Sequence, residues 1–109
     1  MNHYSFEDFL EIVARLRGED GCPWDKVQTH ESLREALLEE AYEAVEAIEK
    51  KDTPNLCEEL GDILLQVVFH ADIEKDAGNF DMTHVIDGIC QKMIYRHPHI
   101  FGTAQASTP

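Results

Sequence analysis

Apolar residues recur every three to four positions in four stretches of the sequence, the spacing of one face of an α-helix. The first stretch predicts a helix over about residues 6–17, with Ser5 as its N-cap and Gly18 as its end. The other helices are expected from after Thr29 to about Lys50, from Pro54 behind a Thr53 cap to about Asp76, and from a Thr83 cap to about Tyr95. No stretch alternates with period two, so the sequence predicts an all-α helical bundle with four main helices.

Glycines and a proline interrupt the helical pattern between residues 18 and 28 and predict a loop there. Trp24 lies inside this loop, where it either folds back as a plug of the core or lines a pocket and stacks on a nucleobase. The turn at Asp52 and Thr53 is short, which predicts antiparallel packing of the two helices that it joins. We expect residues 1–109 to form one domain, with a flexible tail at about 103–109.

The composition narrows the class of function. Asp and Glu number 22 against 9 Lys and Arg, a net charge of -13, so binding to a nucleic-acid duplex is not expected. No apolar run has the roughly 20 residues of a membrane span, and the N-terminus lacks the pattern of a signal peptide. Three well-separated cysteines without a CxxC pair are typical of reduced thiols. We therefore expect a cytoplasmic protein.

Carboxylates pair up on two of the expected helices. Glu40 and Glu43 are three residues apart on the second helix, and Glu59 and Asp62 are three apart on the third, so each pair shares a helical face. Each pair is expected just off the edge of its helix's apolar stripe. If the helices pack through those stripes, the four carboxylates converge at one rim of the interface.

Converging carboxylates need a cation among them, because like charges at short distance repel strongly. An all-oxygen ligand set favours Mg2+ or Mn2+, and Mg2+ commonly joins a few carboxylates to substrate phosphates. The competing interpretation is an ordinary solvated surface, because ExxE spacing arises by chance in acidic helices. Gly61 costs about 1 kcal/mol relative to alanine inside a helix. Its presence indicates a close approach of a partner helix or ligand beside Asp62.

The few basic residues are candidates for phosphate binding. Lys92 and Arg96 are four apart on the last helix, although cations at a helix C-terminus are also favoured by the helix dipole. Lys26 either reaches a phosphate or is simply exposed. The motif His97-Pro98-His99 is interpreted as a structural turn and not as a metal site.

Several motifs occur in the order found in one family. These are Gly21-Cys22-Pro23-Trp24-Asp25-Lys26, Gln28-Thr29-His30, Leu38-Glu39-Glu40-Ala41-Tyr42-Glu43, Glu58-Glu59-Leu60-Gly61-Asp62, Leu65-Gln66-Val67-Val68-Phe69-His70 and Arg96-His97-Pro98-His99-Ile100-Phe101-Gly102. The sequence resembles the MazG nucleotide pyrophosphohydrolases over nearly its whole length. Many members carry two copies of the domain, and this sequence contains one, which resembles the N-terminal copy.

The resemblance implies an all-α bundle that forms a homodimer and hydrolyses nucleoside triphosphates to the monophosphate and pyrophosphate. It implies that four carboxylates hold Mg2+, that Glu39 or Glu43 orients or deprotonates the attacking water, and that two cations face the triphosphate. The implied metal ligands are Glu40, Glu43, Glu59 and Asp62, and the implied cations are Lys92 and Arg96. Two alternatives stay open: a catalytically silent dimerisation module, and an enzyme similar to phosphoribosyl-ATP pyrophosphohydrolases.

Overall fold

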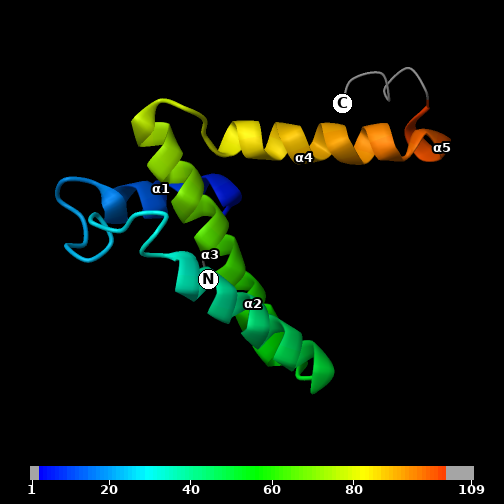
Figure 1. Cartoon of the computed structure of the whole chain (residues 1–109), viewed down its shortest axis with the longest axis horizontal. Helices are drawn as coiled ribbons and strands as arrows, with labels where there is room; N and C mark the ends of the chain where they lie inside the picture. Colours follow the sequence, from blue (N-terminus) through cyan, green and yellow to red (C-terminus); the bar gives the residue numbers. More distant parts are fainter. Residues whose placement is uncertain (1–2, 103–109) are drawn as a thin grey trace. The chain divides into compact units, whose positions relative to one another are not determined.

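A computed structural model describes residues 3–102, and every regular element in that range is a helix. In chain order the helices are α1 (Phe6–Arg17), α2 (Arg34–Glu49), α3 (Thr53–Ala77), α4 (Met82–Arg96) and the short α5 (Pro98–Phe101), as Figure 1 shows. The predicted all-α class with four main helices is thereby confirmed. The tail expected at about 103–109 lies outside the described residues.

The chain divides into two compact units, residues 1–73 and 74–109. The first contains α1, α2 and most of α3, and the second contains the end of α3 together with α4 and α5. Within the described range, no helix is both long and apolar enough to cross a membrane.

Side-chain caps explain where the helices begin. Ser5 caps α1 as expected, and it does so in a capping box: its hydroxyl accepts from the Asp8 N–H at 3.0 Å and the Asp8 carboxylate accepts from the Ser5 N–H at 2.9 Å. Two other predicted caps were wrong. Asp52, and not Thr53, accepts from the N–H of Asn55, the third residue of α3, and Asp81, two residues before Thr83, caps α4. An aspartate carboxylate is a strong acceptor for these amides, which explains the shift.

The second helix begins later than expected. Thr29 and Ser32 exchange hydrogen bonds between backbone amides and side-chain hydroxyls at 2.8 and 3.1 Å, so residues 29–33 form turns and α2 starts only at Arg34. Such local side-chain bonds compete with helical ones. At its far end α2 is joined to α3 by a tight turn in which Lys51 adopts a positive φ of 56°.

The face of α2 that packs against α3 differs from the predicted one. Its buried residues are Ala44 and Ala47, whereas the apolar stripe expected in the core is largely exposed, with Leu38 at 59%, Val45 at 49% and Ile48 at 59%. Alanines let the two helices come close together. The helices therefore meet through a face of alanines and glutamates, and the apolar stripe of α2 stays on the surface of this unit.

The first helix packs on α3 and completes the core of the first unit. Val13 on α1 and Val68 and Phe69 on α3 are buried. The Arg17 guanidinium lies 2.6 Å from the Asp72 carboxylate and 5.6 Å from the centre of the Phe69 ring. α1 is thus held to α3 by apolar burial and by one ion pair that is mostly shielded from water.

Candidate metal centre

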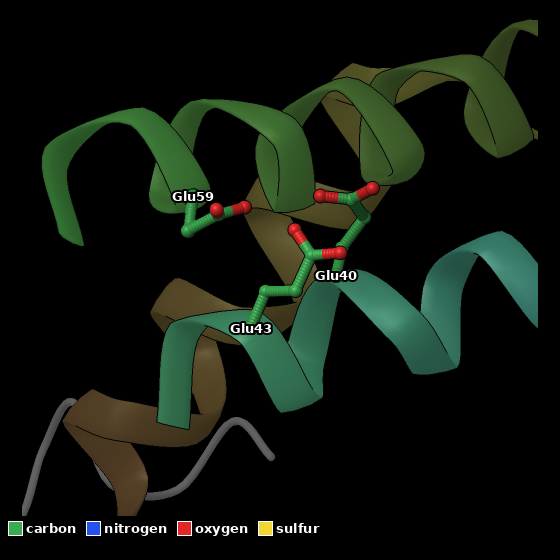
Figure 2. Close-up of side chains that lie close together, drawn as sticks. All are labelled: Glu40, Glu43 and Glu59. Carbon is green, nitrogen blue, oxygen red and sulfur yellow. The ribbon is translucent and has the colours of Figure 1, made fainter. Parts of the chain in front are cut away.

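Three carboxylates converge between α2 and α3. Glu40 and Glu43 extend from α2 and Glu59 extends from α3, and Figure 2 shows the three side chains turned toward one another. One oxygen from each lies within 4.8 Å of the others. The sequence predicted this convergence at the rim of an apolar interface. Glu59 is instead buried, because the glutamates lie on the face through which the helices pack.

The electrostatics of the cluster favour protons or a cation. Burial raises the pKa of Glu59 from 4.5 to about 7, helped by the hydrogen bond that protonated Glu59 donates to Glu43 and by the charges of Glu43, Asp62 and Glu40. Burial also raises the pKa of Glu40, with the charges of Asp62 and Glu43 adding to the effect. Near neutral pH the fully ionised cluster is therefore a high-energy arrangement when no cation neutralises it.

Two buried oxygens in the cluster have no hydrogen-bond donor among residues 3–102. They are Oε2 of Glu40 and Oε1 of Glu59. A buried acceptor without a donor is costly, and a metal ion is one of the groups that satisfies such oxygens. Carboxylate oxygens from two helices, with no nitrogen or sulfur ligand, suit Mg2+ or Mn2+. The residues present therefore fit a hard divalent cation.

Asp62 and Glu39 take different positions from the three clustered residues. Asp62 is half-buried on α3, close enough to Glu40 to hydrogen-bond to it and raise its pKa, although it is not in the set within 4.8 Å. Glu39 is exposed on α2 and also lies outside that set. The geometry brings Asp62 to the edge of the cluster and leaves Glu39 on the surface. Their roles as metal ligand and as base remain predictions.

The loop after α1 carries two of the predicted substrate-binding residues. Trp24 is 74% exposed, which excludes the plug of the core and leaves its ring free to stack. Lys26 is exposed, and its Nζ donates to the backbone carbonyl of Glu19 at 3.1 Å. This hydrogen bond stabilises the loop, and Lys26 would have to break it to reach a phosphate.

The predicted phosphate-binding cations belong to the second unit. Lys92 and Arg96 are exposed on α4, four residues apart and thus on one face. Beyond them, Nδ1 of His97 lies 2.6 Å from the Met93 carbonyl oxygen, and residues 98–101 form the short helix α5. The motif therefore leads into a short helix, and its interpretation as a structural turn and not a metal site stays a prediction.

The close approach expected at Gly61 is not made by the described part of this chain. A Cβ built on Gly61 would have no other heavy atom within 4 Å. The residue instead borders an apolar groove of about 500 Å³, lined mainly by aromatic and aliphatic side chains of α1 and the residues before it. Tyr4, Phe9, Ile12 and Leu64 are among them.

A further contact had no signal of its own in the sequence. His30, in the turns before α2, lies with its Nδ1 at 2.7 Å from Nδ1 of His70 on α3. Between His70 and the carboxylates, Gln66 is buried on α3. Pairing residues 40 positions apart requires the α2–α3 register, which spacing within a single helix does not provide.

Comparison with known proteins settles the family. The model of the MazG nucleotide pyrophosphohydrolase domain matches residues 28–101. This chain belongs to the MazG family. The matched segment of the MazG domain includes α2, α3 and α4, and with them all four predicted metal ligands.

Three relatives show how the MazG domain occurs in longer proteins. The chain is 52% identical over 97 residues to the nucleoside triphosphate pyrophosphohydrolase/pyrophosphatase MazG of Thermotoga maritima, covering 89% of this chain and 38% of that protein. It is 45% identical over 98 residues to the nucleoside triphosphate pyrophosphohydrolase of Escherichia coli K12, covering 89% and 37%. It is 52% identical over 99 residues to the uncharacterized protein YabN of Bacillus subtilis, covering 91% and 20%. The chain thus spans one fifth to about two fifths of their lengths.

Proposed function

We propose that this MazG domain hydrolyses nucleoside triphosphates to the monophosphate and pyrophosphate with Mg2+ or Mn2+ as cofactor. The observation that carries the proposal is the approach of Glu40, Glu43 and Glu59 within 4.8 Å of one another, with two buried oxygens that lack donors. Relatives that are 45–52% identical are also named nucleoside triphosphate pyrophosphohydrolases. The three glutamates would hold the metal, with Asp62 as the fourth ligand.

The chemistry divides between the cofactor and the protein. When bound, the metal supplies positive charge that neutralises phosphate oxygens and orients the phosphate chain. Glu43, which is exposed at the open side of the cluster, or Glu39 beside it, would accept a proton from the attacking water. Lys92 and Arg96 would stabilise the negative charge that develops on the leaving pyrophosphate. Trp24 would stack on the nucleobase, since its ring is exposed.

The proposal includes a homodimer in the cytoplasm. Leu38, Val45 and Ile48 form an exposed apolar stripe along α2, and exposed apolar stripes of this kind mark interfaces. Pairing between two copies of the chain would bury the stripe and extend the bundle. The described cysteines, Cys22, Cys57 and Cys90, are free thiols, which fits a reducing compartment.

Pyrophosphate release from a panel of nucleoside triphosphates, with and without Mg2+, tests the proposed reaction. We expect metal-dependent release of pyrophosphate, with the nucleoside monophosphate as co-product. Glu59→Gln should reduce the rate by at least about 100-fold, because it removes a ligand charge at the metal. Glu58→Gln is the matched control, since it makes the same chemical change on the neighbouring exposed residue of α3.

The outcomes separate the competing functions. Release in both variants at the wild-type rate would contradict the assignment of the metal site. Binding of Mg2+ without turnover of any nucleotide would indicate a catalytically silent dimerisation module. Turnover of phosphoribosyl-ATP in preference to simple nucleoside triphosphates would favour the related pyrophosphohydrolase activity.

A further inference from the structure

Two histidines connect α3 to the turns that precede α2. Nδ1 of His30 lies 2.7 Å from Nδ1 of His70, the two rings are within 8° of parallel, and their centres are 5.0 Å apart. Because the nitrogens are much closer than the ring centres, the rings meet edge to edge through these atoms. One Nδ1 donates its proton and the other accepts it, so the link requires at least one neutral imidazole.

The link lies on the same face of α3 as the carboxylate cluster. Glu59, Gln66 and His70 are separated by seven and four residues, which places them along one side of the helix. Glu59 and Gln66 are buried there and His70 is half-buried. At 1.5 Å per residue, His70 is roughly 16 Å beyond Glu59 along α3. This is the side of α3 that faces α2.

The α2–α3 hairpin is thus connected at both of its ends, and the carboxylate cluster lies between these two connections. At the closed end the tight turn joins the helices, and the Asp52 N–H donates to the Ala47 carbonyl at 2.9 Å. At the other end the chain provides no turn, and the His30–His70 bond makes the connection. Between these points the clustered carboxylates repel one another when they are ionised, which opposes the packing of α2 on α3.

We propose that His30 and His70 are positioning residues whose hydrogen bond closes the open end of the α2–α3 hairpin and holds the carboxylates at the separation that a metal needs. The inference rests on the proposed metal function for its consequence, but the link itself is a property of the metal-free chain. Neither histidine belongs to the carboxylate cluster. They act through the spacing of the two helices.

The surroundings of His70 agree with a neutral, hydrogen-bonded pair. Its Nε2 is buried and has no hydrogen-bond partner in the part of the chain that the structure describes, so a proton added at this nitrogen would leave a buried donor without an acceptor. It would also place two N–H groups against each other when His30 is protonated. Burial and the charge of His30 accordingly lower the pKa of His70.

Two substitutions of His70 distinguish positioning from space-filling. Asparagine places an amide close to where Nδ1 sits, so His70→Asn can keep a hydrogen bond to His30. Leucine fills a similar volume but cannot make that bond. If His70 only packs, leucine is the better replacement. If it positions α2, asparagine is the better one, and the order of the two variants decides.

The experiment measures Mg2+ affinity of the full chain by calorimetry, and backbone hydrogen exchange of the first turns of α2 in metal-free solution. We expect His70→Leu to weaken Mg2+ binding roughly tenfold, the size of effect seen when outer partners of metal ligands are removed. We also expect it to speed exchange in residues 34–38 several-fold, while His70→Asn retains most of both properties. Phe69→Leu is the control, because it loosens the packing of α1 on α3 without touching the link.

Each result bears on the proposal. The proposal is supported if both Mg2+ affinity and protection from exchange decrease in the order wild type, His70→Asn, His70→Leu. The first turns of α2 must also stay protected in Phe69→Leu. Equal behaviour of His70→Leu and wild type, or asparagine worse than leucine, overturns it. If wild type binds no Mg2+, the proposed metal function fails, and the exchange measurement alone still decides whether the histidines hold α2.

Discussion

A carboxylate oxygen of Glu40 on α2 lies within 4.8 Å of one of Glu59 on α3, and each residue has a buried oxygen without a hydrogen-bond donor. Two like charges held this close across a helix interface oppose the packing that brings them together. The interface persists because alanines on α2 allow close approach and because protonation relieves the repulsion. Stability and metal binding should therefore respond to pH in opposite directions.

The metal-free protein should lose stability as pH rises from about 5 to 8. The folded pKa of Glu59 is about 7 and its ordinary value is 4.5, so between these values the folded state binds more protons than the unfolded state. The free energy of unfolding consequently decreases over this range. Thermal unfolding in EDTA, compared between wild type and Glu59→Gln, measures the effect. The lowered pKa of His70 acts in the opposite direction but is common to both proteins.

The variant should have the flatter profile of the two, with its advantage over wild type largest near pH 8. Parallel profiles for the two proteins would show that Glu59 titrates normally in the folded state.

Mg2+ affinity should increase as pH rises through 7. Metal ligation requires the ionised carboxylate, and Glu59 is largely protonated below that pH. Calorimetry in two buffers of different ionisation enthalpy reports the protons released on binding. We expect close to one proton per metal at pH 6 and far fewer at pH 8. Proton release that does not change between these pH values would contradict a metal site containing Glu59.

The sequence predicted the helices and the approach of three of the four carboxylates, because both depend largely on local spacing. The pairs Glu40/Glu43 and Glu59/Asp62 each lie on one helical face, and a short turn forces the two helices side by side. The orientation of α2 was predicted wrongly. An apolar stripe was expected to face the core, whereas the buried positions are Ala44 and Ala47.

The orientation of α2 was predicted wrongly because apolar periodicity identifies a helical face that favours burial, but does not identify the partner that covers this face. In α2 one face packs within the chain and the leucine, valine and isoleucine face is exposed in this unit. Helix starts were missed for a related reason. Thr53 and Thr83 are acceptable caps in sequence, but Asp52 and Asp81 accept the hydrogen bonds that cap α3 and α4. The His30–His70 contact depends on the register between two segments, which no local pattern encodes.

The ion pair of Arg17 and Asp72 should make a large contribution to keeping α1 on α3. Their side chains are 9% and 13% exposed and the charged atoms lie 2.6 Å apart. Removing one partner leaves the other charge poorly solvated, so Asp72→Ala should lower the free energy of unfolding by about 3 kcal/mol. Urea denaturation measures it. The apolar pair Arg17→Met with Asp72→Leu should recover much of this loss, and strictly additive single effects would contradict the argument.

The exposed stripe of α2 should control the proposed association of two chains. Ile48 is 59% exposed in this unit, and a lysine there would place a charge in the proposed apolar interface. We expect Ile48→Lys to shift the protein from dimer to monomer in sedimentation velocity at micromolar concentration, with its helical circular dichroism retained. Glu49→Lys adds positive charge at the neighbouring exposed position and should leave the dimer intact. An Ile48→Lys protein that sediments as wild type does would exclude this face.

Two glycines should respond to alanine with opposite signs. A Cβ at Gly21 would meet the carbonyl oxygens of Arg15 and Leu16, where the loop folds back on the end of α1. These backbone atoms cannot move aside, since the Leu16 carbonyl accepts from the Cys22 N–H at 2.8 Å. Gly61 lies within α3 and its Cβ would enter open space. Gly21→Ala should therefore destabilise the fold, by roughly 1–3 kcal/mol, and Gly61→Ala should stabilise it by up to about 1 kcal/mol through helix propensity.

Chemical denaturation of both variants measures these changes, and Gly88→Ala in α4, also facing open space, is the reference for propensity alone. The comparison also probes the groove beside Gly61. If a second chain packs closely there, Gly61→Ala will gain less stability than Gly88→Ala. The stability of the Gly61→Ala protein will then also depend on protein concentration, whereas that of the Gly88→Ala protein will not. Equal gains at all concentrations would mean that the groove stays open to solvent and that any dimer forms through the stripe of α2.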